Sequence, residues 1–384
     1  MKTFKVKKIS KNSQARRGTL KTKHGKLETP FFMPVATQGS IKLASAEDLR
    51  TLGAQILLSN TYHLMLRPGE KLIKQQGGLH SFMNWQKPIL TDSGGYQVFS
   101  LAQDRTKSGQ SLVKLSDRGV KFKSYLDGKE YDLTPEKSLQ IQSDLGVDIA
   151  VCLDECVALP ATKKYIQESI RLTTSWAERT KQYHQEKLKG QKPLLFAVIQ
   201  GGLDQKLRLK SLEELTVIGF DGYNIGGLSV GESPQEMYEV LDYLCPAMPS
   251  DKPRYLMGVG YPENIIEGVK RGVDMFDCVI PTREGRHGRL FVFKKNAEQL
   301  IKKSLQSKKV NPGDFYTAIN ITNAKFAKDK TIINSASKIK ELNTLSKAYL
   351  HHLFRIQEPL GQRLATLNNL EFYLKLMEYI RKNI

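Results

Sequence analysis

Short apolar segments recur along the chain, and each ends in a corner of polar residues or glycine. Most of them are followed by a stretch that is typical of a helix. Continuous apolar strands that alternate with helices indicate a parallel sheet, so the pattern predicts an α/β fold. The predicted strands span residues 31–39, 54–63, 88–95, 148–155, 194–202, 222–228, 254–260 and 275–282. Eight repeats favour a (β/α)8 TIM barrel, whose functional groups gather at the carboxyl ends of its strands. A doubly wound sheet is the main alternative.

Two of the intervening segments carry clear signals for the start of a helix. Thr134 and Ser233 are favoured N-cap residues, and each is followed by a proline, which suits the first turn. Gly146 is typical of the residue that ends a helix. We therefore expect helices to begin at residues 135 and 234.

Two regions interrupt the repeat. Residues 101–133 alternate between apolar and polar positions with a period of two, and they contain turn signals at 117–119 and 127–128, which predicts an inserted antiparallel hairpin or small sheet. From about residue 290 the chain becomes rich in lysine and ends in two helical stretches, 345–356 and 368–383. We therefore expect a barrel over 1–290 and a basic, mostly helical subdomain over 291–384, packed on the barrel. The lysine-rich segment 294–315 is either a basic helix or loop facing a polyanion, or a solvated surface.

The composition of the chain indicates what kind of partner it binds and in which cellular compartment it works. The chain has 384 residues, and 59 Lys and Arg against 39 Asp and Glu give a net charge of +20. Such an excess favours a polyanionic partner, although a solvated lysine-rich surface would look the same. No stretch reaches the roughly 20 apolar residues of a membrane span, and the basic N-terminus lacks the apolar core of a secretory signal. We therefore expect a cytoplasmic protein without a membrane partner. Its cysteines form no CxxC pair, so we expect reduced thiols.

The corners after the predicted strands concentrate groups that bind or react. They contain Asp92, Asp154, Glu155, Gln200, Gly226, Gly227, Met257 and Asp277. Any one acid could cap a helix or pair with an arginine, but a barrel would bring all of them to one mouth. Carboxylates and amides bind the hydrogen-bonding edge of a ring such as a purine, and paired glycines allow close approach of the backbone. Two acids, one as nucleophile and one as proton carrier, are the usual equipment for breaking a glycosidic bond.

Several motifs resemble the tRNA-guanine transglycosylase (queuine tRNA-ribosyltransferase) family of bacterial type. They are LSNTYHLMLRPG (58–69), TDSGGYQVFSL (91–101), LDEC (153–156), VIQGG (198–202), IGGLSVGE (225–232), YLMGVG (255–260), DMFDCVIPTREGRHG (274–288) and the tail from 346 to 373. They are collinear and cover nearly the whole chain. The family fold is a (β/α)8 barrel with insertions, which agrees with the strand count.

The resemblance implies a reaction that exchanges the wobble guanine of tRNA for a 7-deazaguanine, in queuosine biosynthesis and without a cofactor. Asp277 resembles the nucleophile that forms a covalent aspartyl-ribose intermediate, and Asp92 resembles the general acid/base. We expect the neighbours of Asp277 to keep it ionised; the alternative is a purely structural ion pair with Arg283. A non-catalytic tRNA-binding paralogue and a barrel hydrolase acting on free nucleosides are the competing functions.

The resemblance also assigns residues to the two substrates, the base and the anticodon loop of tRNA. Asp154 and Gln200 are implied to bind the purine edge with backbone of Gly227 and Leu228, Tyr96 and Met257 to cover the two ring faces, and Cys156 and Val230 to complete the pocket. A branched side chain at Val230 favours the small base 7-aminomethyl-7-deazaguanine over queuine. Arg283 and Arg286 resemble arginines that hold the flanking nucleotides. His63 is either a hydrogen-bonded core histidine or a residue near the site.

One part of the family pattern is missing. The family carries a structural zinc bound by three cysteines and a histidine, and the corresponding positions here are Ser337, Ile339, Leu342 and Asn368. A zinc site cannot form from these side chains, so we predict that this zinc is absent. In relatives the zinc subdomain lies near a homodimer interface, so a homodimer and an assembly without that interface are both open here.

Overall fold

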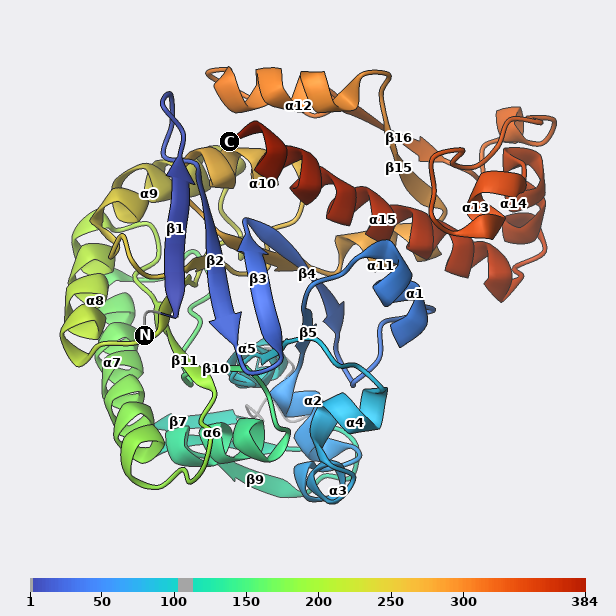
Figure 1. Ribbon diagram of the computed structural model, residues 1–384. Helices are drawn as coiled ribbons and strands as arrows, with labels where there is room; N and C mark the ends of the chain where they lie inside the picture. Colours follow the sequence, from blue (N-terminus) through green and yellow to red (C-terminus); the bar gives the residue numbers. More distant parts are fainter. Residues whose placement is uncertain (1–2, 103–112) are drawn as a thin grey trace.

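The computed structural model describes residues 3–102 and 113–384. Eight parallel strands form a closed barrel in which β14 pairs with β4 and β6 pairs with β10 (Figure 1). The strands are β4 (Phe31–Ala36), β5 (Leu57–Ser59), β6 (Ile89–Thr91), β10 (Ile149–Val151), β11 (Leu194–Ile199), β12 (Gly222–Ile225), β13 (Arg254–Leu256) and β14 (Met275–Cys278). Every strand lies inside a segment that the apolar pattern predicts. The predicted (β/α)8 fold is confirmed, and the doubly wound alternative is wrong.

Helices follow the strands of the barrel. They are α1 (Ala46–Leu52), α2 (Thr61–Leu66), α3 (Glu70–Gln75), α4 (Gly78–Met83), α5 (Gly95–Ala102), α6 (Pro135–Asp144), α7 (Lys163–Glu186), α8 (Gln205–Ile218), α9 (Pro234–Ala247), α10 (Pro262–Lys270) and α11 (Ile280–Arg286). The predicted caps are confirmed: the side chain of Thr134 accepts a hydrogen bond from the N–H of Lys137, and Ser233 forms a capping box with Glu236.

A small antiparallel sheet closes the amino-terminal end of the barrel. It consists of β1 (Phe4–Ile9), β2 (Arg16–Thr22) and β3 (Gly25–Thr29). Its apolar residues Phe4, Leu20 and Leu27 are buried against residues inside the barrel, including Phe196 and Met275. The sequence pattern did not predict this sheet. It seals the end of the barrel opposite to the mouth, so the mouth is where a ligand enters.

Buried charges fasten this sheet to the barrel. Arg16 at the start of β2 binds Asp274, which precedes β14, through Nε (3.0 Å) and Nη2 (2.5 Å). His24, in the turn after β2, and His80 of α4 each place a ring nitrogen 3.1 Å from Oδ2 of Asp148, which precedes β10. These ties hold a lysine-rich sheet against the barrel at its base.

The predicted inserted sheet is confirmed. It contains β7 (Val113–Ser116), β8 (Gly119–Lys123) and β9 (Glu130–Leu133), which pair antiparallel. The part of the predicted insertion at 103–112 lies outside the described residues, and residues 101–102 end helix α5.

The carboxyl-terminal region contains more strand than the sequence predicts. Its elements are β15 (Arg289–Phe293), α12 (Ala297–Gln306), β16 (Tyr316–Asn320), the short 3-10 helix η1 (Ala324–Phe326), α13 (Lys340–Thr344), α14 (Lys347–Arg355) and α15 (Pro359–Asn383). The antiparallel pair β15–β16 was not predicted, and α15 begins nine residues before the expected start at 368. Part of the lysine-rich segment 294–315 is helical, as α12. In the described part of the chain, no helix combines the length and apolar character needed to cross a membrane.

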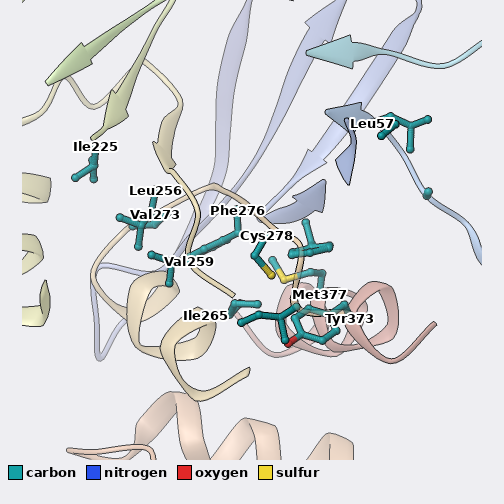
Figure 2. Packing of buried hydrophobic residues seen from close by; sticks show 14 of the residues in the cluster. Leu57, Ile225, Leu256, Val259, Ile265, Val273, Phe276, Cys278, Tyr373 and Met377 are labelled. Atoms are coloured by element: carbon teal, nitrogen blue, oxygen red, sulfur yellow. The ribbon is translucent and has the colours of Figure 1, made fainter. Parts of the chain in front are cut away.

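Helix α15 braces the barrel near its mouth. Figure 2 shows Tyr373 and Met377 of α15 beside Cys278 of β14. The Tyr373 hydroxyl donates to the carbonyl of Gly260 (2.6 Å), and the Asn369 amide donates to the carbonyl of Pro281 (3.1 Å). The loop after β13 and the first turn of α11 are therefore both held from outside by one late helix.

Candidate active site

A cavity of about 450 Å³ opens at the carboxyl ends of the barrel strands. Its walls include most of the residues that the sequence assigns to the site: Asp92, Tyr96, Asp154, Cys156, Gln200, Gly227, Leu228, Val230, Met257, Asp277 and Arg283. Arg286 is the exception, because it does not line the cavity and its Nε donates to the carbonyl of Thr282 (3.2 Å) within α11. The sequence-based prediction that one barrel mouth brings the acids, the amide and the glycines together is confirmed for all of them but Glu155. Glu155 does not line the cavity, and its carboxylate accepts a hydrogen bond from the Tyr165 hydroxyl instead.

One oxygen of Asp277 is held by two donors from the neighbouring strand and its loop. The Tyr255 hydroxyl donates to Oδ1 (2.6 Å), and the Gly258 N–H donates to the same atom (2.7 Å). Met275 and Asp277 alternate with Phe276 along β14, so the carboxylate points into the barrel while Phe276 packs against the outer helices. The two donors fix Oδ1 and leave Oδ2 for a ligand.

Two features of the environment of Asp277 bear on the expectations from the sequence. The alternative of a structural ion pair with Arg283 is wrong, because the ion pair that Arg283 forms among the described residues is with Glu284 (Nε to Oε1, 3.6 Å). Burial raises the pKa of Asp277 above its ordinary value, although the hydrogen bonds from Gly258 and Tyr255 act to lower it. The hydrogen-bonding neighbours therefore favour the charged form, as expected, while desolvation opposes them and sets the net direction.

Asp92, at the end of β6, is held by the corner that follows β5. Its Oδ1 accepts from the N–H groups of Thr61 (2.9 Å) and Gly94 (3.2 Å), and its Oδ2 accepts from the side-chain amide of Asn60. Burial, with the negative charges of Asp277 and Asp154, raises the pKa of Asp92 to about 7. A carboxyl group with a pKa near neutrality can both give and take a proton at physiological pH.

Asp154 and Gln200 meet on a third side of the cavity. Gln200 Nε2 donates to Oδ2 of Asp154 (2.7 Å), and the Ser93 hydroxyl donates to Oδ1 (3.3 Å). Burial raises the pKa of Asp154 to about 6, while those two hydrogen bonds act to lower it. Together the carboxylate and the amide offer both acceptors and donors side by side in the cavity wall, which suits the edge of a purine-like ring.

Glycines after β12 let the backbone approach these groups closely. Gly227 has a φ of +61°, and a Cβ at this position would lie 2.5 Å from Oε1 of Gln200. The following turn is held by Glu232, whose Oε2 accepts from the Val230 N–H (3.1 Å).

Burial raises the pKa of Cys156 to about 12, so its side chain is a neutral thiol in the wall of the cavity.

Tyr96 and Met257 lie in the walls of the same cavity on different elements. Tyr96 is in α5 and is 53% exposed, whereas Met257 follows β13 and is partly buried. His63 also lines the cavity, and its buried Nδ1 has no hydrogen-bond partner among the described residues. The interpretation of His63 as a hydrogen-bonded core histidine is therefore wrong. Burial lowers the pKa of His63, which favours the neutral ring.

Sequence reasoning missed the donors that hold the two acids. Tyr255 is fully buried in an apolar strand and looks like a core residue, and Asn60 reads as an ordinary helix cap, which it also is through the N–H of His63 (3.0 Å). The available signal was the spacing of two residues between Tyr255 in β13 and Met257 just after it, since both side chains line the cavity.

Comparison with known proteins identifies the family. The family model described as Queuine tRNA-ribosyltransferase matches residues 11–384. The chain belongs to this family. A queuine tRNA-ribosyltransferase of Halothermothrix orenii is 47% identical over 370 residues, covering 96% of this chain and 90% of that protein. Proteins of the same name from Desulforamulus reducens (46% over 381 residues, 99% and 94% coverage) and Clostridium perfringens (45% over 383 residues, 98% and 93% coverage) are also similar.

The positions at which the family resemblance predicts zinc ligands hold a different set of contacts. The Ser337 hydroxyl donates to the carboxylate of Glu371, and Asn368 Nδ2 donates to a main-chain carbonyl (3.1 Å). Ile339 and Leu342 are buried among apolar residues. Neither apolar side chain can donate electrons to a metal ion, and no thiolate is present at these positions, so the four residues do not fit a zinc ion.

Among the described residues, His24, His80 and Asp148 could hold a metal ion by their spacing. The two histidine rings are stacked with their centroids 3.7 Å apart, and Asp148 also accepts from the N–H groups of His24 (2.8 Å) and Ile89 (3.0 Å). The carboxylate is already saturated with hydrogen bonds, which favours a structural tie between the sheet and the barrel over a metal centre.

Proposed function

We propose that this protein exchanges the guanine at the wobble position of tRNA for a 7-deazaguanine, as a tRNA-guanine transglycosylase of queuosine biosynthesis. The observation that carries the proposal is the pair of carboxylates, Asp92 and Asp277, in one cavity of a chain that belongs to the family. The anticodon loop is the substrate region, because a base in a single-stranded loop is the easiest to flip into a pocket. The net charge of +20 supports binding of a polyanion of this kind.

In the first displacement, Asp277 attacks the anomeric carbon of the flipped nucleotide. Oδ2 forms the bond to the carbon while Tyr255 and Gly258 hold Oδ1. The bond to the purine nitrogen breaks, and its electron pair stays with the leaving guanine. Asp92 in its protonated form gives that nitrogen a proton. The product is a covalent aspartyl-ribose intermediate, as in a retaining glycosidase.

The second displacement reverses these roles. Asp92, now a carboxylate, takes the proton from the ring nitrogen of the incoming base, and that nitrogen attacks the same carbon. The bond to Asp277 breaks, and its electron pair returns to the carboxylate. A pKa of about 7 suits Asp92 to both halves of this cycle, because its protonated and ionised forms are both accessible near neutral pH. The proton that Asp92 gives in the first step is replaced in the second. Neither a redox step nor an external energy source is required.

The cavity walls support the assignment of base contacts. Asp154 and Gln200 bind the hydrogen-bonding edge of the purine, the backbone of Gly227 and Leu228 contributes further contacts, and Tyr96 and Met257 cover the faces of the ring. Cys156 fills the wall as a thiol. Arg283 on the rim of the cavity, with Arg286 further along α11, contacts the nucleotides that flank the target.

Val230 favours a small incoming base. Its branched side chain lines the cavity in the turn held by Glu232, so a bulky substituent on the five-membered ring meets it. The proposed substrate is 7-aminomethyl-7-deazaguanine. Exchange of queuine with neglect of the small base by the purified protein would contradict this assignment.

The central experiment measures incorporation of labelled guanine into tRNA by the wild type and by Asp277→Ala. We expect the wild type to label tRNA but not free guanosine, and we expect Asp277→Ala to lose labelling while it still binds tRNA. A denaturation-resistant adduct between protein and tRNA should form only when Asp277 is present. Binding of tRNA without exchange and without adduct would support the non-catalytic paralogue, and labelling of free guanosine would support a nucleoside-processing enzyme.

The remaining proposals concern metal, assembly and compartment. We propose that the protein works without the family zinc, which elemental analysis of purified protein and an exchange assay with a chelator will test: a stoichiometric metal or a loss of activity overturns it. A homodimer is the proposed assembly, to be measured by light scattering. Cytoplasm, where tRNA is available, is the proposed compartment.

A further inference from the structure

A fully buried arginine lies beneath the loops that carry Gln200 and Gly227. Arg208 of α8 has no exposed surface, and its guanidinium makes five hydrogen bonds to main-chain carbonyls. Nε and Nη2 donate to Gly202 (2.9 and 2.6 Å), Nη1 donates to Ile199 (3.3 Å) and Gly226 (2.9 Å), and Nη2 donates to Gly227 (3.5 Å). One side chain therefore links the ends of β11 and β12 just below the cavity.

This arrangement is costly for folding. Arg208 lies near the amino terminus of α8, where the helix dipole disfavours a cation, and none of the ion pairs between described residues involves it. Burial lowers the pKa of Arg208 to about 10, which still leaves the guanidinium charged at neutral pH. Both the loss of hydration and the helix dipole make the charged Arg208 side chain unfavourable at this position. Its presence therefore points to a role other than stabilising the fold.

The surrounding backbone is shaped to admit this side chain. Gly201 has a φ of +137°, and a Cβ there would lie 2.7 Å from the N and Cα atoms of Arg208. Only glycine lets the start of α8 approach the end of β11 so closely.

The geometry of the peptide unit connects Arg208 to the cavity. The carbonyl of Gly226 and the N–H of Gly227 belong to one trans peptide, so they point in opposite directions. Because the carbonyl accepts from Arg208, the N–H points away from Arg208, toward Cys156 in the cavity wall. A cation bound at the carbonyl also polarises the peptide and makes its N–H a stronger donor.

We infer that Arg208 is a positioning residue for the base: it aims and strengthens the Gly227 N–H that faces the cavity and fixes the backbone on either side of Gln200. The inference rests on the proposed exchange reaction. Arg208 does not touch the base, and it acts through the two loops that do. A base with a carbonyl oxygen beside the Gly227 N–H gains most from this arrangement.

The test compares Arg208→Met and Arg208→Lys with Arg254→Met. Arg254 is a matched control, because it is also a buried arginine that donates to carbonyls (Gly272, 3.4 Å; Met248, 3.1 Å), but it lies at the start of β13, away from the mouth. Lysine keeps the charge but cannot bridge several carbonyls as a planar fork does. Exchange kinetics for the free base, tRNA binding by filter retention and denaturant unfolding are measured for each.

We expect the KM for the free base to rise roughly 10- to 100-fold in Arg208→Met, as for loss of one or two hydrogen bonds to the substrate. The KM of Arg208→Lys should lie between those of Arg208→Met and the wild type. Arg254→Met should be less stable than the wild type but keep its KM. All three variants should bind tRNA as the wild type does. Should Arg208→Met fail to fold, the KM of Arg208→Lys decides. A KM that changes no more than in Arg254→Met overturns the inference, whereas failure of the wild type to exchange guanine overturns the proposed function instead.

Discussion

The hydrogen bond from Tyr255 to Asp277 gives a quantitative prediction about the proposed nucleophile. In Tyr255→Phe, Oδ1 of Asp277 keeps the Gly258 N–H (2.7 Å) but loses the hydroxyl at 2.6 Å. A hydrogen bond to a charged group contributes about 1.5–3 kcal/mol. Since the Tyr255 hydroxyl lowers the pKa of Asp277 and burial raises it, removing the hydroxyl raises that pKa further.

The consequence appears in the pH dependence of adduct formation. Asp277 must be ionised to attack, so the acid limb of the rate profile should move to higher pH by roughly one to two pH units, at 1.36 kcal/mol per unit. Above the limb, the rate should approach that of the wild type. The assay is single-turnover formation of the protein–tRNA adduct, quantified on denaturing gels across a pH series.

A matched control comes from the neighbouring strand. Tyr223 of β12 is equally buried, but it packs against the outer helices rather than pointing at Asp277. Tyr223→Phe should therefore leave the acid limb where it is in the wild type. A profile of Tyr255→Phe that is superimposable on the wild type, or one that is lowered equally at every pH, would refute the reasoning.

Three further predictions concern other groups. Asp92→Asn should slow exchange at pH 7 by roughly 10²- to 10⁴-fold, because the amide can neither give nor take the proton, and guanine incorporation measures this. Gly227→Ala should raise the KM for the base, because the new methyl group would meet a side chain at 2.5 Å, while Gly190→Ala, also at positive φ (+74°) but with open space, should not. Asp148 has its pKa lowered to about 2 from 3.8, chiefly through hydrogen bonds that overcome burial, so its carboxylate contributes about 2 kcal/mol above pH 4 that is lost as the pH falls toward 2. The free energy of unfolding of Asp148→Asn should therefore lie below that of the wild type at pH 6 and converge with it on acidification; a pH-independent difference would contradict this.

The barrel was predictable because its signal is local and repeated. Each strand is a short, continuous apolar segment, buried on both faces, and each is followed by a polar corner. Once eight such segments close into a barrel, the residues after them must converge. The grouping of Asp92, Asp154 and Asp277 therefore followed from the strand count before any distance was known.

The elements that were missed depend on pairing between distant or weakly patterned segments. Strand β1 buries only Phe4 fully among lysines, so its residues look like a basic tail rather than a strand. Strands β15 and β16 pair across the 22 residues that separate them, which no local pattern reveals. The start of α15 was hidden by Gly361, which is required because a Cβ there would lie 2.9 Å from Leu353.

The hydrogen-bonding partners of the candidate site residues were not predicted, for a different reason. Tyr255 and Arg208 sit where apolar or amphipathic patterns predict packing residues, and only the fold shows what their polar atoms reach. Sequence pattern identifies charged residues at strand ends, but the donors that set their orientation and pKa values lie on neighbouring elements.

The bracing of the mouth by α15 has a consequence for synthesis on the ribosome. The carbonyls of Gly260 and Pro281, on either side of Asp277 in the sequence, accept hydrogen bonds from Tyr373 and Asn369, which follow about 90 to 110 residues later in the chain. When all eight barrel strands have left the ribosome, helix α15 has not yet been made, so these two hydrogen bonds cannot form. Competence for chemistry should thus arise late and abruptly during translation, when the last long helix emerges and docks, rather than gradually as the strands are made.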